Sequence, residues 1–156
     1  MSGTETPGRV RPLVLRVGLG FLAVSQGVIG AWALLAPETF YRYFPGTAVG
    51  WVSLLPPYNE HLVRDVGALS LALTVLLGYA AVRPEPRTVQ LALAAFAVYA
   101  VPHTIFHALH LEGFRPADAV AQMTGFALQI ALLVVLFLTT IRRVSAGSRR
   151  DSPARP

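Results

Sequence analysis

The chain has no cysteine and no lysine, and charged residues make up only 13% of its 156 positions. Without cysteine there is no disulfide-stapled scaffold and no cysteine-ligated zinc or redox centre. A water-soluble domain carries about 25% charged residues, whereas 54% of this chain is hydrophobic and its mean hydropathy is +0.54. This composition excludes intrinsic disorder and indicates a single membrane domain of a few helices.

Four long apolar stretches account for the high hydropathy; they cover residues 13–35, 62–82, 88–109 and 119–141. At about 1.5 Å per residue each stretch is long enough to cross a hydrocarbon core of about 30 Å. The first is too long for the core of a signal peptide, and the second and third contain long uncharged runs that a water-soluble bundle would not tolerate. We therefore expect an all-α, integral membrane four-helix bundle over residues 13–141, with disordered tails at 1–12 and 142–156.

The thirteen arginines indicate how the helices cross the membrane. Nine of them fall before the first stretch, between the second and third, or after the fourth: Arg9, Arg11, Arg83, Arg87, Arg142, Arg143, Arg149, Arg150 and Arg155. The loops of the other side hold only Arg42 and Arg115. Because basic loops stay in the cytoplasm, we expect both termini to be cytoplasmic. The net charge of +5 then reflects orientation in a lipid bilayer and not binding to nucleic acid.

The connection between the first and second stretches is long, and on this orientation it is extracytoplasmic. It holds six aromatic residues: Phe40, Tyr41, Tyr43, Phe44, Trp51 and Tyr58. Aromatic side chains favour the headgroup level, so an interfacial belt explains them. A lid over a site between the helices is the functional alternative. Residues 38–44 are expected to form a short amphipathic helix that ends at Pro45 and Gly46.

Polar side chains within the stretches gather toward the outer face. His61 and Asp65 are four residues apart, and His103, His107 and His110 are spaced by four and three, so each set shares one helix face. A carboxylate at the centre of a membrane costs about 2.5–3.5 kcal/mol, which favours a function for such groups.

Neighbouring residues at the start of the second stretch have structural explanations. Asn59 is a plausible N-cap, and Glu60 lies in the first turn, where it can pair with Arg64. Pro102 is expected to break the third helix just before His103 and to widen its outer half.

The remaining stretches add amides and one carboxylate to the predicted site. The pocket candidates are Asp65, His103, His107, Gln122, Gln26 and Gln129, with Glu60, His61, His110 and Asp118 at the rim.

Three interpretations of these residues stay open. A transition metal or haem would find imidazole and carboxylate ligands in His103, His107, His61 and Asp65. A pocket for a small molecule or lipid would use Asp65 and His103 as an acid–base pair. In the structural interpretation the histidines are interfacial and the glutamines only bind helices together.

Two motifs carry a resemblance to known proteins: Phe44–Gly46 followed by Trp51, and the string from Pro57 to Gly67. They resemble a family of small four-span bacterial membrane proteins without an assigned activity, and the layout of residues 13–141 resembles DoxX-like membrane proteins. The resemblance implies a four-helix fold in the bacterial inner membrane and a link to membrane redox and thiol-stress systems. Since this chain has no cysteine, any thiol chemistry would belong to a partner.

The sequence thus predicts an integral membrane protein with an outward-facing polar pocket. It would bind a small molecule or lipid, or serve as a redox-linked subunit beside a partner protein or a second copy of itself. The alternatives are a membrane enzyme that acts on a lipid or isoprenoid-like substrate, and a metal- or haem-binding protein.

Overall fold

The computed structural model describes residues 7–46, 50–55 and 57–150, with the side chains of 13–141 among them. The described chain is helical and has no strand. Its elements are α1 (Pro7–Leu35), α2 (Pro37–Tyr43), the 3-10 helix η1 (Trp51–Leu54), α3 (Glu60–Val82), α4 (Pro86–Ala108) and α5 (Pro116–Arg150). Four segments are long and apolar enough to cross a membrane: Leu13–Leu35, Glu60–Val82, Pro86–Ala108 and Pro116–Ile141. The expected all-α class and the four spans are confirmed.

Most of the apolar surface of these spans faces outward. The buried share of their most apolar windows is 39% in α1 and only 11% in α5. Val75 in α3 and Val98 in α4 are 73% and 78% exposed. Large apolar side chains exposed in this number are costly in water and stable among lipid tails. The structure therefore supports a bilayer environment.

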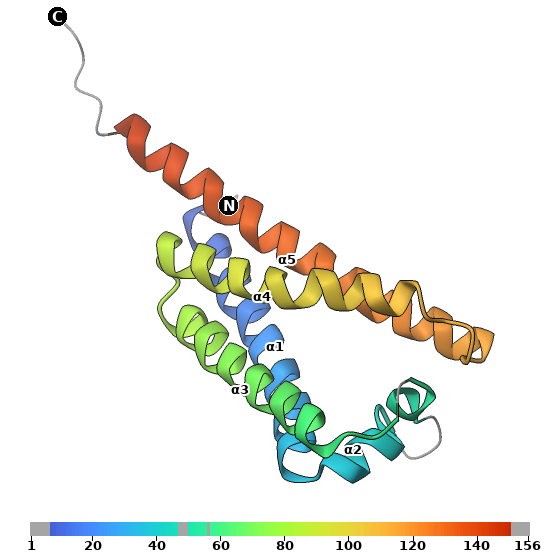
Figure 1. Ribbon diagram of the computed structural model, residues 1–156. Helices are drawn as coiled ribbons and strands as arrows, with labels where there is room; N and C mark the ends of the chain where they lie inside the picture. Colours follow the sequence, from blue (N-terminus) through green and yellow to red (C-terminus); the bar gives the residue numbers. More distant parts are fainter. Residues whose placement is uncertain (1–6, 47–49, 56, 151–156) are drawn as a thin grey trace, which may run out of the picture.

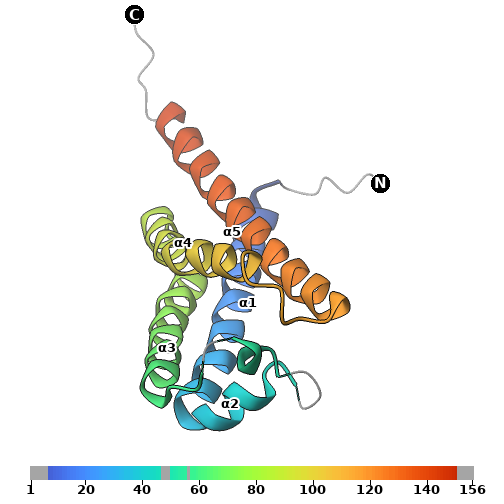
Figure 2. The same ribbon diagram turned by 45° about the vertical axis from the view of Figure 1, so that its right-hand side comes forward.

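The four spans form two pairs that diverge. Figures 1 and 2 show α1 and α3 lying antiparallel, α5 running beside α4, and the two pairs spreading apart away from the short α3–α4 connection. The start of α1, the α3–α4 connection and the end of α5 lie at one end, while α2 and the α4–α5 connection lie at the other. The bundle expected from the sequence is therefore open at the end that carries α2.

The buried apolar core explains why the pairs stay together at only one end. Its largest members come from all four spans: Leu15, Leu19, Leu22, Leu77, Leu93, Phe96 and Leu136. Except for Leu22, which lies at the middle of α1, they lie in the half of their helix nearer to the start of α1 and the end of α5. The other half lacks such a shared core, so the two pairs are free to separate there.

Close backbone contact joins α1 to α3. A Cβ added at Gly67 would lie 2.6 Å from the Leu34 nitrogen, and one added at Gly30 would lie 2.9 Å from the Gly67 carbonyl oxygen. Only glycine allows helices in a membrane to approach so closely. The α1–α3 contact is the most extensive in the molecule.

Several local expectations are confirmed. The side chain of Asn59 caps α3 by accepting a hydrogen bond from the Leu62 amide at 3.1 Å. Helix α2 forms within one residue of the predicted segment. Helices α1 and α5 extend to Pro7 and Arg150, into residues expected to be tails, because hydropathy marks the membrane-embedded part of a helix and not its hydrogen-bonded ends.

The predicted break at Pro102 is wrong. Helix α4 continues through this residue to Ala108. Thr104 donates its hydroxyl to the Ala100 carbonyl at 2.8 Å, one turn back in the same helix. Membrane helices tolerate an internal proline when hydroxyl groups and local adjustment satisfy the nearby backbone. The wide end of the molecule, which carries α2, therefore arises from the divergence of whole helices.

Candidate functional site

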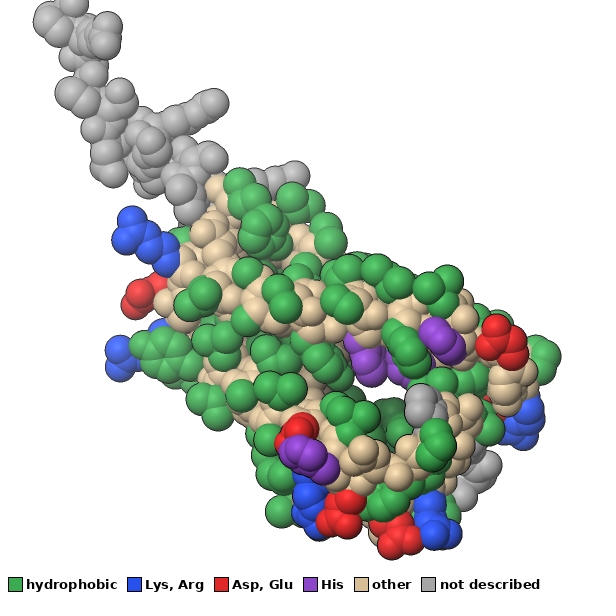
Figure 3. All heavy atoms as spheres, viewed as in Figure 1, with side chains coloured by type: hydrophobic (Ala, Val, Ile, Leu, Met, Phe, Trp, Pro, Cys, Tyr) green, Lys and Arg blue, Asp and Glu red, His purple; other side chains and the backbone are tan. Residues whose placement is uncertain are grey.

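A hollow separates the two helix pairs at their diverging end. The space-filling view shows an opening bounded by α3, by α4 and by the segment that leads into α3 (Figure 3). Histidine side chains lie on the α4 side of this opening. The polar residues of α4 and α5 beside it form the strongest candidate site.

Three ring side chains follow one face of α4 at intervals of four residues. Tyr99 stacks on His103, with ring centroids 5.2 Å apart, and His103 meets His107 edge to face at 4.6 Å. Residues four apart are neighbours on a helix surface, so this contact follows from the sequence spacing. The expected pairing of His103 with His107 is present.

Helix α5 completes this group. Phe126 packs against both histidine rings, at 5.4 Å from His103 and 5.0 Å from His107. Gln122 lies one turn earlier and faces His107. We name these five residues, Tyr99, His103, His107, Gln122 and Phe126, the α4–α5 polar cluster.

Two atoms of the α4–α5 polar cluster are buried without a hydrogen-bond partner. His107 and Gln122 are 7% and 4% exposed, and His107 Nδ1 and Gln122 Oε1 each lack a partner within the described part of the chain. A buried polar atom left unsatisfied costs about 1–3 kcal/mol. The two side chains face each other across the α4–α5 interface, but His107 Nδ1 and Gln122 Oε1 have no hydrogen bond of ordinary geometry among the described residues.

Of the expected rim residues, His61 lies on α3, outside this group, whereas His110 just after α4 lies close to His107. His61 pairs with Asp65 at 3.4 Å on the exposed first turns of α3. His110 stacks on Phe106 at 4.1 Å and bonds the Phe106 carbonyl through Nδ1. These residues sit at helix ends that the divergence carries outward.

The two halves of the predicted site are thus not assembled. In residues 7–46, 50–55 and 57–150, no three histidine, aspartate or glutamate side chains come together where they could hold one metal ion. Asp65 and His103 were expected to face one pocket. Because α3 and α4 diverge from their short connection, residues at the same depth on these two helices are separated sideways.

The two other amide candidates lie elsewhere. Gln26 is 1% exposed in α1, and its Oε1 lacks a partner among the described residues. It falls in α1 one turn before the Gly30 contact with α3. Gln129 is half-buried farther along α5.

The 3-10 helix η1 approaches the α4–α5 connection and the start of α5 across the end of the hollow that carries α2. The indole of Trp51 in η1 faces Asp118 in α5, and a Cβ at Gly113 would lie 3.8 Å from the Leu54 Cβ. Asp118 also accepts a hydrogen bond from Arg115 at 2.6 Å, which raises the pKa of the Arg115 guanidinium. Asp118 is therefore a rim residue whose carboxylate is engaged by Arg115.

Sequence reasoning missed several residues of the site. Tyr99 carried a usable signal, because it precedes His103 by four residues on the same helix face. Phe126 carried none, because its contact with the histidines depends on how α5 packs against α4. Trp51 was expected in an interfacial belt or in a lid over a site between the helices, without a named partner.

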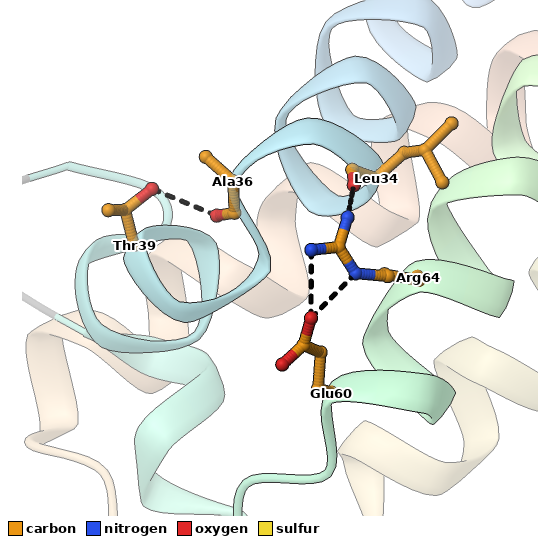
Figure 4. A network of polar contacts seen from close by, with 5 residues as sticks. All are labelled: Leu34, Ala36, Thr39, Glu60 and Arg64. Atoms are coloured by element: carbon orange, nitrogen blue, oxygen red, sulfur yellow. Dashed lines mark hydrogen bonds and ion pairs between the residues drawn. The ribbon is translucent and has the colours of Figure 1, made fainter.

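Another polar group joins α1 to α3 on the far side of the hollow. Arg64 donates to Glu60 at 2.9 Å and to the Leu34 carbonyl in the last turn of α1 (Figure 4). The expected Glu60–Arg64 pair is confirmed. Carbonyls at a helix C-terminus lack partners within their helix, so Arg64 completes the end of α1. A shallow pocket of about 210 Å³ lies here, between α2 and the start of α3.

Comparison with known proteins adds no relative: no family model, no curated protein and no solved structure matches this chain. The class of protein rests on the fold alone. Four apolar helices with outward-facing apolar surface support a multi-pass helical membrane protein.

Proposed function

We propose that this membrane protein binds a small molecule or lipid in the hollow between its helix pairs, with the α4–α5 polar cluster as the polar end of the site. The observation that carries the proposal is the buried pair of His107 Nδ1 and Gln122 Oε1, both without partners among the described residues. Ligand sites are mostly apolar with a few polar groups that fix orientation. Apolar helix walls and this cluster fit that description.

A purely structural role explains the cluster less well. Glutamine and histidine bind membrane helices together by donating and accepting hydrogen bonds across an interface. Gln122 and His107 lie on facing helices, yet one buried polar atom of each, Gln122 Oε1 and His107 Nδ1, has no partner among the described residues. A ligand that bonds both atoms would remove this cost.

The proposal also includes the orientation of the protein in the membrane and its relationship to a known family. The ends rich in arginine lie together, with the start of α1, the α3–α4 connection and the end of α5 (Figure 1). By the positive-inside rule this end is cytoplasmic in the bacterial inner membrane, and the hollow opens toward the outer side. A DoxX-like relationship, with a redox partner protein or a second copy, belongs to the same proposal and is supported by the four candidate spans and by the start of α1 and the end of α5 lying at one end.

The enzymatic and metal-binding alternatives have weaker support. The ion pair that Asp65 makes in the described structure is with His61, so an acid–base pair with His103 requires α3 to approach α4. The contact of His103 with His107 at 4.6 Å offers two imidazoles to a metal, fewer than the three or four protein ligands of zinc sites.

The test is native mass spectrometry of the protein purified in a mild detergent. We expect the wild type to retain one bound amphiphile, and Gln122→Met and His107→Phe to reduce the retained fraction by about tenfold, the effect of losing about 1.4 kcal/mol of binding. His61→Phe, at an exposed site on α3, is the matched control and should retain it. Bare protein in every sample would reject the proposal, and metal analysis with a haem absorption spectrum tests the cofactor alternative.

A further inference from the structure

The outer end of the hollow is crossed by α2 and η1, which we call the strap (Pro37–Tyr43 and Trp51–Leu54). One side of the strap is fixed to the α1–α3 pair. Trp32 in α1 packs against Phe40 at 5.8 Å and donates its indole N–H to Thr39 at 2.9 Å. The amide of Trp51 then donates to the Phe44 carbonyl at 2.7 Å, which joins η1 to the end of α2.

The other side of the strap reaches the α4–α5 pair. Leu54 lies against Gly113 in the α4–α5 connection, and Trp51 faces Asp118 at the start of α5. The strap therefore ties the two diverging pairs together across the end of the hollow that faces water in the proposed orientation. Access from that side is obstructed.

The flank of the hollow is different. An opening remains between α3 and α4 (Figure 3), and both helices carry exposed apolar side chains at membrane depth. Leu69 in α3 is 62% exposed and Ile105 in α4 is 53% exposed. In a bilayer such surfaces meet lipid tails.

The polar cluster also restricts the headgroup of a ligand. Gln122 Oε1 can only accept a hydrogen bond, whereas His107 Nδ1 donates or accepts according to its tautomer. One hydroxyl can donate to the first atom and accept from the second. A phosphate or carboxylate would need a cation, and the nearest arginine along the chain, Arg115, already pairs with Asp118 at 2.6 Å.

We infer that the hollow takes an uncharged, hydroxyl-bearing amphiphile that reaches it sideways from the bilayer between α3 and α4, while the strap stays closed. The inference rests on the proposed function and names its ligand class and route of access. His107 Nδ1 and Gln122 Oε1 are closed off from solvent in the ligand-free protein, so the hydroxyl reaches them only when side chains between them and the hollow move aside, while the hydrocarbon chains lie in the opening between the helices.

A disulfide across the strap tests the route. The chain has no cysteine of its own, and the Cβ separation of 3.8 Å between Leu54 and a residue at position 113 suits a disulfide. The variant Leu54→Cys/Gly113→Cys is reconstituted in phosphatidylcholine vesicles with a photoreactive diacylglycerol, and saturable labelling of the peptide from Pro116 to Arg142 is measured. The single variant Gly113→Cys is the control for the substitution itself.

We expect the oxidised and reduced forms of the double variant to be labelled equally. Loss of labelling on oxidation that a reductant restores would overturn the lateral route and leave the proposed function standing. Absence of saturable labelling in the wild type would instead reject the proposed function.

Competition tests the headgroup. Unlabelled dioleoylglycerol should compete at a concentration about tenfold lower than phosphatidic acid with the same chains, because phosphatidic acid carries a phosphate in place of the hydroxyl. A tenfold difference corresponds to the loss of about one hydrogen bond between neutral groups. Equal or stronger competition by phosphatidic acid would overturn the uncharged class. Gln122→Met should reduce saturable labelling, while His61→Leu should leave it unchanged.

Discussion

Along the α1–α3 interface, backbone meets backbone at Gly30 and Gly67, and a single added Cβ would collide with a main-chain atom. In the α4–α5 pair, His107 Nδ1 and Gln122 Oε1 are buried without a hydrogen-bond partner among the described residues. The first contact is as close as two helices can come. The second contact leaves two polar atoms without hydrogen-bond partners beside the hollow.

The α1–α3 contact is explained by stability alone, whereas the α4–α5 contact needs a functional explanation. Close glycine contacts strengthen dispersion attraction between helices and need no other explanation. Unsatisfied buried polar atoms weaken the folded state, and where they persist a ligand or other role is the explanation to test. The α1–α3 pair therefore serves as the rigid frame, and the α4–α5 polar cluster is the part to examine for function.

The largest expected effect is on the frame. Gly67→Ala places a Cβ 2.6 Å from the Leu34 nitrogen, and because backbone cannot yield cheaply we expect a loss of about 1–3 kcal/mol. Gly78→Ala in the same helix meets nothing within 4 Å and should be neutral or slightly stabilising. Thermal unfolding in detergent, followed by circular dichroism, compares them. Equal melting temperatures would show that α1 and α3 are not in close contact.

The next effect concerns the arginine that completes α1. Arg64→Ala removes the hydrogen bonds to Glu60 and to the Leu34 carbonyl, and since the Arg64 side chain is 43% exposed we expect a loss of only about 1 kcal/mol. Arg42→Ala is the control, because Arg42 pairs only with an exposed neighbour, Glu38, and such pairs contribute about 0–1 kcal/mol. If both variants unfold alike, the bond to Leu34 contributes nothing.

The frame was largely predictable from the sequence, because its signals are local. Hydropathy defined four spans, the spacing of Asn59 before an apolar run predicted a cap, and Glu60 with Arg64 followed from helical periodicity. Each of these depends on residues within a few positions of one another. The short helix after α1 was predictable for the same reason.

The candidate site was predictable only in part. The contact of His103 with His107 follows from spacing within one helix, and it is present. Whether Asp65 joins them depends on the angle between α3 and α4, which hydropathy does not encode. Phe126 and Trp51 likewise acquire their neighbours from packing between helices and from the course of a connecting segment.

A smaller effect of opposite sign sharpens the comparison. Gln122→Met keeps the length of the side chain but removes an acceptor that has no partner among the described residues. In ligand-free protein we therefore expect stability to be unchanged or to rise by up to about 1 kcal/mol. Gln129→Met, at a half-buried site on the same helix, is the control. A clear loss for Gln122→Met alone would mean that His107 and Gln122 bond each other and that the cluster only joins helices.

The smallest effect is expected at the first turns of α3. His61 and Asp65 pair at 3.4 Å with side chains that are 86% and 56% exposed, so replacing both with His61→Leu and Asp65→Asn should change stability by no more than about 0.5 kcal/mol. Ligand retention should match the wild type, because these residues lie outside the α4–α5 polar cluster. Mass spectrometry and thermal unfolding of one preparation measure both. If retention fell while stability held, Asp65 would belong to the ligand site, α3 would have to close onto α4 when ligand binds, and the open arrangement would be one of two states.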